Sequence, residues 1–367
     1  MKSNPTLRHQ VGSLLIVGVE STALTALETA WLRAIQPSGI ILFRRNIELP
    51  AQIHSLFRNA SAVLQQPFFR CVDLEGGTVD RLRDLIGPTP SAAEVTATGN
   101  KKMYRKHGDW IGRALRALDF NVDLAPVLDL ALTQSQAVMG TRAASAYPAR
   151  VAAYAREFLA GLSRQGVLGC GKHFPGLGGG TLDSHHATPR IARTWEQIRQ
   201  QDLEPYRALT SKLPLIMVNH AAYPKIERPV LPASLSRFWI TEVLRGKLRY
   251  RGLVISDDME MGGVLDYASP EAAAIEAIAA GTDLLEICHR ADRVLATHEA
   301  LLREAEKSPA FRRGVVAAAS RVAKARQHLL RKTLQPRPLS ASGLKKLQAA
   351  QQRLREEIAL ARTKGAA

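Results

Sequence analysis

The stretch from Gly171 to Pro189 holds residues that can do acid–base chemistry. It reads GKHFPGLGGGTLDSHHATP. An imidazole titrates near neutral pH, and a carboxylate two residues away, as Asp183 is from His185, can hold its tautomer and raise its basicity. The glycines of this stretch disfavour both helix and strand. We therefore expect a strand that ends at Lys172–His173, followed by a long loop that carries a catalytic pair.

Asp257 is the second candidate for chemistry. The run GLVISDDMEM (252–261) places this carboxylate directly after a short apolar strand, where it can face a pocket without being buried in the core. Cleavage of a glycoside with retention needs a carboxylate that attacks the anomeric carbon and an acid that protonates the leaving oxygen. Asp257 fits the first role. His185, paired with Asp183, fits the second and would later act as the base.

The elements that must position these residues form a regular series. Eight apolar, β-rich runs recur along the chain, with helix-like segments between them. This alternation predicts parallel βα units, and eight units predict an α/β fold of the (β/α)8 TIM-barrel type over residues 1–290, with a doubly wound open sheet as the alternative. The predicted strands are Ser13–Val19, Gly39–Phe43, Phe69–Leu74, Phe120–Pro126, Val167–Lys172, Leu213–Asn219, Gly252–Ser256 and Asp283–Ile287. The predicted helices are Thr22–Ile35, Pro50–Gln65, Asn100–Leu118, Pro148–Gln165, Thr194–Leu209, Leu235–Leu248 and Pro270–Gly281.

Polar residues follow five consecutive predicted strands. In such barrels the functional residues gather at the C-terminal ends of the strands. A single aspartate at a strand end is often only a helix cap, but five strands in a row favour a shared site. These residues are Asp73, Glu75 and Arg81; Asp123 and Asp129; Lys172 and His173; Asn219 and His220; and Asp257 and Asp258.

The remaining 77 residues, 291–367, form a basic extension without an evident strand. Ala291–Lys307, Phe311–Lys332 and Leu344–Arg362 are predicted helices that pack on the barrel or on a partner subunit. From Leu301 onward there are 16 Lys/Arg and 4 Asp/Glu, which accounts for +12 of the net charge of +17. Phe311 is the only aromatic residue there, whereas nucleic-acid binders pair basic surface with stacking aromatics. We expect a solvated basic face and no nucleic-acid partner.

Cysteine usage and hydropathy bear on the compartment. Cys71, Cys170 and Cys288 lie far apart in or beside apolar runs, without the spacing of a zinc site. Buried free thiols in a reducing, cytoplasmic compartment are expected. The sequence has no run of 18 apolar residues, so we expect no membrane insertion. The apolar run Val11–Gly18 is interpreted as the first strand rather than a secretory signal, because Glu20 follows at once and no Ala-x-Ala site closes it.

Several motifs together resemble glycoside hydrolase family 3, in particular its bacterial β-N-acetylhexosaminidases. The resemblance runs from about Gly39 to Cys288. The motifs, in the family's order, are Gly39–Asn46 (GIILFRRN), Asp73-x-Glu-Gly-Gly77, Asn121–Asp129 (NVDLAPVLD), Gly140-Thr-Arg142, Lys172-His-Phe-Pro-Gly176, Asp183-Ser-His185 and Ser256-Asp-Asp258.

The resemblance implies a role for each matching residue. Asp257 would be the nucleophile, and His185 the acid/base assisted by Asp183. The residues that would bind a terminal N-acetylglucosamine are Asp73, Arg81, Arg142, Lys172 and His173; their types suit the task, because carboxylates accept from sugar hydroxyls while Arg and Lys donate. No cofactor and no metal is implied.

The resemblance further implies a retaining exo-β-N-acetylglucosaminidase, a monomer or homodimer, that acts on muropeptide-type cell-wall fragments in cytosolic peptidoglycan recycling.

Two departures from the family's motif pattern bear on loop closure and substrate choice. Leu177–Gly180 (LGGG) stands where the family usually has His-Gly-Asp-Thr, and Thr78 where it usually has Arg.

Other functions are open at this stage. A family 3 β-glucosidase usually takes its acid from a further C-terminal domain and lacks Asp-Ser-His. A phosphorylase is an alternative, because a neutral histidine repels phosphate less than a carboxylate does. A sugar-binding pseudoenzyme would rest on the altered Leu177–Gly180 run. A metal hydrolase on His173, His185 and His186 is disfavoured, because two adjacent histidines do not readily face one ion.

Overall fold

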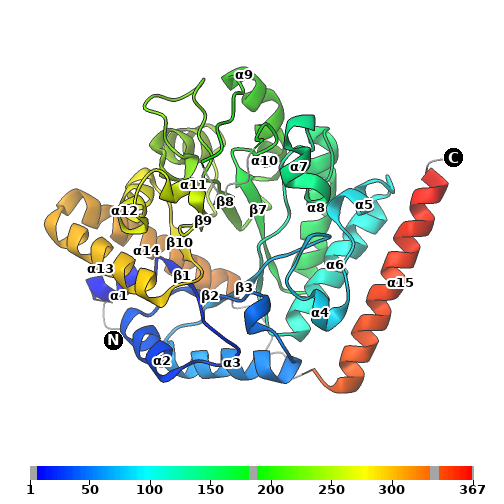
Figure 1. Cartoon of the computed structure of the whole chain (residues 1–367), viewed down its shortest axis with the longest axis horizontal. Coiled ribbons are helices and arrows are strands. Elements are labelled where there is room, and N and C mark those ends of the chain that lie inside the picture. Colours follow the sequence, from blue (N-terminus) through cyan, green and yellow to red (C-terminus); the bar gives the residue numbers. More distant parts are fainter. Residues whose placement is uncertain (1–5, 182–187, 331–338, 366–367) are drawn as a thin grey trace.

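Eight parallel strands close into a barrel, and helices surround it (Figure 1). The computed structural model describes residues 6–181, 188–330 and 339–365. The strands follow one another around the barrel in chain order, and the last pairs with the first. The predicted barrel is confirmed, and the open-sheet alternative is excluded. The barrel strands are β1 (Leu15–Gly18), β2 (Gly39–Ile41), β3 (Phe69–Val72), β6 (Val122–Asp123), β7 (Leu168–Phe174), β8 (Leu215–Val218), β9 (Leu253–Asp258) and β10 (Leu284–Ile287).

Successive residues of each strand alternate between the barrel interior and the outer layer. On β10, Leu284 packs with interior side chains of other strands, such as Ile16 and Ile255, whereas Leu285 and Ile287 pack against the surrounding helices. Both faces are therefore buried, which explains why the strands read as continuous apolar runs.

The helices of the outer layer mostly match the predicted segments. Thr25 caps the second helix through a capping box with Glu28, so this helix begins at Ala26 rather than at Thr22. The segments predicted as helices over 194–209 and 235–248 are helical, but Ile198–Asp202 and Phe238–Lys247 within them are π-helical. Sequence periodicity does not separate the π-helical from the α-helical hydrogen-bonding pattern. The helices around the barrel are α2 (Ala26–Ile35), α3 (Pro50–Val63), α6 (Lys101–Ala117), α8 (Pro148–Arg164), α9 (Trp195–Gln197), α10 (Leu203–Leu209), α11 (Gly262–Leu265) and α12 (Pro270–Ala280).

Several short elements were not predicted, and two of them bear on the architecture. Helix α1 (Leu7–Gly12) precedes the first strand, and a hairpin of β4 (Leu74–Gly76) and β5 (Val79–Asp80) follows the third. The hairpin needs glycine at position 76, where φ is +84° and a Cβ atom would lie 2.0 Å from the carbonyl oxygen of Pro90. This close approach holds the hairpin against the segment that leads into α5 (Ala92–Thr96).

Helices α13 (Ala291–Lys307) and α14 (Pro309–Leu329) pack on the barrel. Val322 and Leu330 join the cluster of interior side chains, and Arg321 Nε donates to Asp283 Oδ1 at 2.6 Å, directly before β10. Helix α14 therefore covers the N-terminal end of the barrel. The domain boundary at residue 290 stays a prediction.

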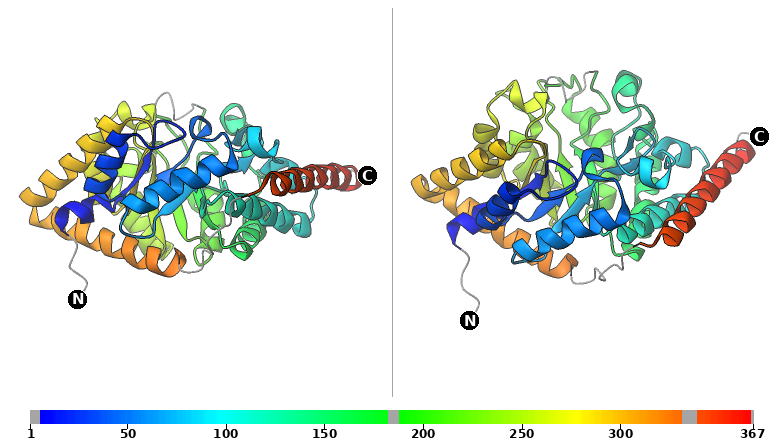
Figure 2. Two further views of the ribbon diagram at one scale, coloured as in Figure 1. Left: turned by 90° about the horizontal axis from the view of Figure 1, so that it is seen from below. Right: turned by 60° about the horizontal axis from the view of Figure 1, so that its bottom comes forward.

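Helix α15 (Ala341–Gly365) lies on the side of the molecule away from α13 and α14 (Figures 1 and 2). It runs along α4 (Arg83–Ile86), α5 and α6. Leu347, Leu354 and Ile358 form its buried stripe, and Gln348 Nε2 donates to the carbonyl oxygen of Leu85 at 2.9 Å. Within the described ranges, no helix is long and apolar enough to cross a membrane.

Truncation of Leu354 tests the docking of α15. This side chain is 1% exposed, and Leu354→Ala should weaken the docking by about 2–5 kcal/mol through lost burial and a cavity. We expect faster amide hydrogen exchange across residues 341–365. Leu360→Ala, on the same helix but 57% exposed, is the matched control and should leave the exchange unchanged. Equal acceleration in both variants would contradict the packing described.

Candidate active site

A cavity of about 440 Å3 lies at the C-terminal ends of the barrel strands. A volume of this size is in the range of small-molecule sites. Residues from seven segments of the chain meet in its lining, as expected for a barrel. Six residues selected from the sequence are among them: Asp73, Arg81, Arg142, Lys172, His173 and Asp257.

The predicted acid/base pair, Asp183 and His185, lies outside the described residues. The chain after it is anchored at Thr188, whose Oγ1 donates to the carbonyl oxygen of Gly263 at 2.7 Å and whose N–H donates to Asp266 Oδ2 at 3.1 Å. Thr188 is therefore fixed to α11 (Gly262–Leu265) and to Asp266 directly after it, in the segment that follows the strand carrying Asp257. Over residues 6–181, 188–330 and 339–365, no group of three or more His, Cys, Asp or Glu is arranged to hold a metal ion.

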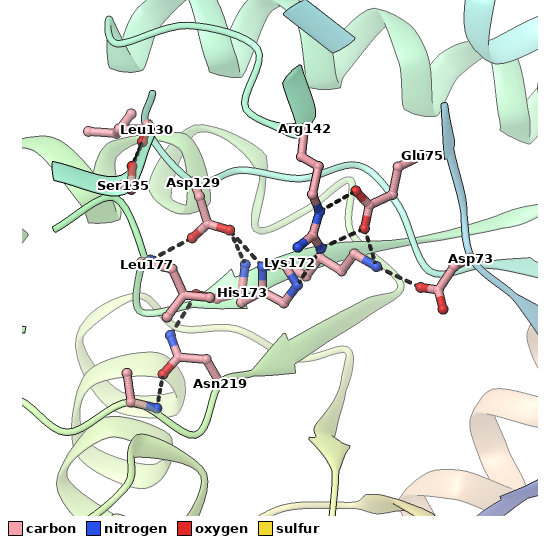
Figure 3. A network of polar contacts seen from close by, with 12 residues as sticks. Asp73, Glu75, Asp129, Leu130, Ser135, Arg142, Lys172, His173, Leu177 and Asn219 are labelled. Carbon is pink, nitrogen blue, oxygen red and sulfur yellow. Dashed lines mark hydrogen bonds and ion pairs between the residues drawn. The ribbon is translucent and has the colours of Figure 1, made fainter. Parts of the chain in front are cut away.

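Lys172 joins two carboxylates in the wall of the cavity (Figure 3). Its Nζ lies 2.7 Å from Asp73 Oδ1 and 2.7 Å from Glu75 Oε1. Arg142 binds Glu75 from the other side, with Nε and Nη2 each 2.8 Å from a carboxylate oxygen. Such bidentate pairs are strong and geometrically specific. Glu75, from the hairpin, is thus the centre of the network.

Opposite charges outweigh burial in this network. Burial by itself would raise the pKa of Glu75, but Arg142 and Lys172 hold that pKa below its ordinary value. Burial would lower the pKa of Lys172, but Asp73 and Glu75 raise it above its ordinary value. Burial would also lower the pKa of Arg142, but Glu75 raises it above its ordinary value. All three groups are therefore charged at neutral pH.

His173 is held in place by its two neighbours. Its Nδ1 lies 2.6 Å from Asp129 Oδ2, and its Nε2 lies 3.2 Å from Arg142 Nη2. These two contacts fix the orientation of the ring. Asp129 also accepts the backbone N–H of Leu177 at 2.6 Å. This carboxylate therefore fixes both the end of β7 and the start of the loop after it.

Leu177 gives the cavity an apolar surface at the point where the sequence departs from the family pattern. The side chain is buried and lines the cavity with Val138 and Met139. Behind it, a Cβ atom on Gly178 would lie 2.8 Å from the carbonyl oxygen of Leu130. The LGGG run is therefore packed tightly against the barrel at its start.

Arg81 forms the rim of the cavity next to Asp73. Its Nε is 3.8 Å from Asp73 Oδ2, and its guanidinium lies over the ring of Phe43, 5.6 Å from the ring centre. Phe43 also contacts His289, with ring centres 5.2 Å apart, and His289 Nε2 lies 3.2 Å from Asp258 Oδ2. The rim is thus a mixed aromatic and polar surface.

Asp257 stands at the end of β9 with its carboxylate in the cavity lining. The backbone N–H of Asp258 donates to Asp257 Oδ1 at 3.0 Å. Burial would raise the pKa of Asp257, but His173, His220 and Lys172 lower it below its ordinary value. The group is therefore ionised at neutral pH. The Nε2 atom of His220 lies 3.0 Å from the carbonyl oxygen of Asp258, the residue after Asp257.

Sequence reasoning gave no role to several residues of the site. Glu75 and Asp129 were noted only as polar residues at strand ends, although each holds two other site residues. Glu286 was missed, although it lines the cavity. An acidic residue inside the apolar run LLEI was the signal that could have revealed it.

Comparison with known proteins identifies the class. Residues 6–325 match the family model described as the glycosyl hydrolase family 3 N terminal domain. The chain belongs to glycosyl hydrolase family 3 and is a glycoside hydrolase. The resemblance seen in the motifs is therefore confirmed.

Individual relatives show which activities occur among similar members of the family. β-Hexosaminidases of Idiomarina loihiensis and Pseudomonas aeruginosa are 36% and 37% identical over 279 residues, which cover 75% and 76% of this chain and 83% and 82% of theirs. The solved family 3 β-N-acetylglucosaminidase of Paenibacillus sp. str. FPU-7 superposes with a TM-score of 0.89 at 29% identity, over 96% of this chain and 68% of its own. A family 3 glycosyl hydrolase of Mycobacterium smegmatis gives a TM-score of 0.80 at 30% identity, over 88% and 97%.

Replacement of Glu75 tests the ion network. Glu75→Gln leaves Lys172 and Arg142 short of a buried partner and should lower the free energy of unfolding by about 3–5 kcal/mol at pH 7. Because the folded pKa of Glu75 is depressed, its contribution is complete above the unfolded pKa of about 4.3 and is lost as the pH falls below it.

The difference between wild type and Glu75→Gln should therefore shrink in urea unfolding as the pH is lowered from 7 to 3. Glu196→Gln, which removes an exposed partner of Arg199, is the control and should leave stability nearly unchanged, because solvent screens such a pair. A difference that stays constant down to pH 3 would refute the assignment.

Proposed function

We propose that the protein is a retaining exo-β-N-acetylhexosaminidase that removes terminal β-linked N-acetylglucosamine. The observation that carries this proposal is an ionised Asp257 in a cavity whose other wall holds fixed donors and acceptors. The names of the solved and curated relatives support the acetamido sugar. The match of Asp73, Lys172 and Asp257 to the family motifs supports their roles.

In the proposed mechanism, Asp257 attacks the anomeric carbon. A bond forms between its carboxylate oxygen and that carbon, while the bond to the leaving oxygen breaks and His185 gives that oxygen a proton. His185 then takes a proton from water, the water oxygen bonds to the anomeric carbon, and Asp257 leaves as a carboxylate. Asp183 orients the imidazole. The depressed pKa of Asp257 suits this role, since the attacking group must be ionised.

The ion network would hold the sugar. Asp73 accepts from paired sugar hydroxyls, while Lys172, Arg142 and Arg81 donate to hydroxyl or acetamido oxygens. Because Lys172 and Arg142 are already fixed by Glu75, these donors need little reorganisation when the substrate binds. His173, held between Asp129 and Arg142, completes this wall.

We further propose muropeptide-type cell-wall fragments as natural substrates, with N-acetylglucosamine linked to anhydro-N-acetylmuramic acid, and a place in cytosolic peptidoglycan recycling. The motif resemblance supports this step. We place the second sugar against the rim of the cavity, which is lined by Arg81, Phe43 and His289.

Substitution of the proposed nucleophile tests the mechanism. With aryl β-N-acetylglucosaminides, Asp257→Ala should lower kcat by about 10⁴-fold or more, because no covalent intermediate can form. His185→Ala should lose about 10²–10⁴-fold, with a larger loss for poor leaving groups that need protonation. Aryl β-glucosides should be cleaved far more slowly by the wild type.

The readouts are release of the aryl alcohol and the anomer of the first-formed sugar. Asp292→Ala, which removes an exposed carboxylate paired with Arg290, is the control and should turn over normally. Full activity in Asp257→Ala, or an inverted product, would reject the mechanism.

A further inference from the structure

Glu286 is a buried carboxyl group to which the mechanism above gives no task. It lies on β10, is 2% exposed, and lines the cavity next to Asp257 and Asp73. Its backbone N–H donates to Ser256 Oγ at 3.1 Å, but no hydrogen bond or ion pair of the carboxyl group occurs within the described part of the chain. A buried carboxyl oxygen without a partner costs stability, so this position needs an explanation.

The strand register points this side chain into the barrel. Leu284 and Cys288, two residues before and after Glu286, both pack in the interior cluster. Side chains alternate along a strand, so Glu286 shares their direction. Three other residues of the cavity follow the same rule, because each lies two positions after an interior side chain: Asp73 after Cys71, Lys172 after Cys170, and Asp257 after Ile255. Glu286 thus belongs to the same ring of inward polar groups.

The surroundings of Glu286 favour a neutral carboxyl group. Burial raises its pKa well above the ordinary value, and Asp73, Asp257 and Asp258 raise it further. Lys172 opposes them, but its ammonium group already binds Asp73 and Glu75. A further negative charge here would be repelled by its neighbours. A protonated carboxyl group instead offers one O–H donor.

We propose that Glu286 is a further substrate-binding residue, which donates a hydrogen bond from the floor of the cavity to a hydroxyl group of the bound sugar. This inference rests on the proposed function of the same site. A sugar hydroxyl both donates and accepts: it can give its hydrogen to Asp73 while its oxygen accepts from Glu286. An uncharged hydroxyl ligand satisfies both residues without adding charge to a site rich in carboxylates.

The proposal predicts a pH dependence of sugar binding. The proposal requires the O–H donor of Glu286 at neutral pH, and this donor is lost as the pH rises through the raised pKa of the group. The thiols that face Glu286 keep their protons over the same range, since burial raises their pKa values well above the ordinary value. The charged or titratable groups that face it are Asp73, Lys172, Asp257, Asp258, Cys71, Cys170 and Cys288.

Two substitutions separate the donor from the volume of the side chain. Glu286→Gln keeps an N–H donor without a titrating group, and Glu286→Met keeps only the volume. Leu284→Met is the matched control, since it changes an interior residue of the same strand one layer lower. The measurements are kcat and KM for an aryl β-N-acetylglucosaminide, binding of free N-acetylglucosamine between pH 6 and 9.5, and Tm.

We expect Glu286→Met to lower kcat/KM by about tenfold, mainly through KM, and to weaken N-acetylglucosamine by a similar factor. Its Tm should equal or exceed that of the wild type, because an unsatisfied buried carboxyl group is gone. Glu286→Gln should stay within about threefold of the wild type at pH 7. Binding should weaken at alkaline pH in the wild type more than in Glu286→Gln.

If the wild type turns over normally, any of three results would overturn the proposal. Glu286→Met could leave kcat/KM unchanged, or Glu286→Gln could be as impaired as Glu286→Met. The third such result is a loss of kcat/KM in Leu284→Met equal to that in Glu286→Met. A wild type that binds N-acetylglucosamine without cleaving the glycoside would contradict the proposed hydrolysis. The affinities of the Glu286 variants for N-acetylglucosamine would then test the role of Glu286. A wild type that neither binds nor cleaves would defeat both.

Discussion

The site depends on one physical constraint, the burial of the Lys172 ammonium group. A buried cation is tolerated only when carboxylates pair with it, and Asp73 and Glu75 supply them at 2.7 Å each. Glu75 in turn is bound by Arg142. Strand β7, the β4–β5 hairpin and the turn after α7 (Gln136–Met139) are therefore locked together by charges that cannot separate without leaving one of them unpaired. The polar groups of the cavity are therefore held in place by the protein itself, which is the preorganisation that the proposed function requires.

The barrel supplies the rest through its alternation of side chains. The interior cluster is apolar at Cys71, Cys170, Ile255 and Leu284. Two residues further along the same strands or directly after them, at the catalytic end, the inward positions become charged or titratable. The packed apolar cluster inside the barrel thus supports the polar residues that line the cavity. The site is therefore rigid and still open to solvent. Helix α14 covers the opposite end of the barrel, where Arg321 binds Asp283. The two ends have separate tasks, one for stability and one for chemistry.

Much of this arrangement could be predicted from local patterns. Eight buried strands read as apolar runs because both of their faces are covered, and the residues at their ends were visible as polar breaks. The hairpin that carries Glu75 was missed, because its glycines and charges read as loop; only the close approach of Gly76 to Pro90 makes it a defined element. The π-helical segments were missed because their periodicity in sequence resembles that of ordinary helices. The pair Asp183 and His185 lies outside the described residues, so its role rests on the motif.

The sequence by itself determined the class of fold, the catalytic end of the barrel and the candidate Asp257, since these follow from hydrophobic periodicity and from residue types at strand ends. Only the tertiary structure decided which charges meet. Glu75 and Arg142 are 67 residues apart, and their contact follows from the pairing of β3 with β6, the strands that precede them, rather than from any local pattern. The raised pKa of Glu286 is likewise a property of the tertiary structure, because it depends on burial and on carboxylates from other strands. Electrostatic energy depends on distance and solvent access, and neither is written in the order of residues.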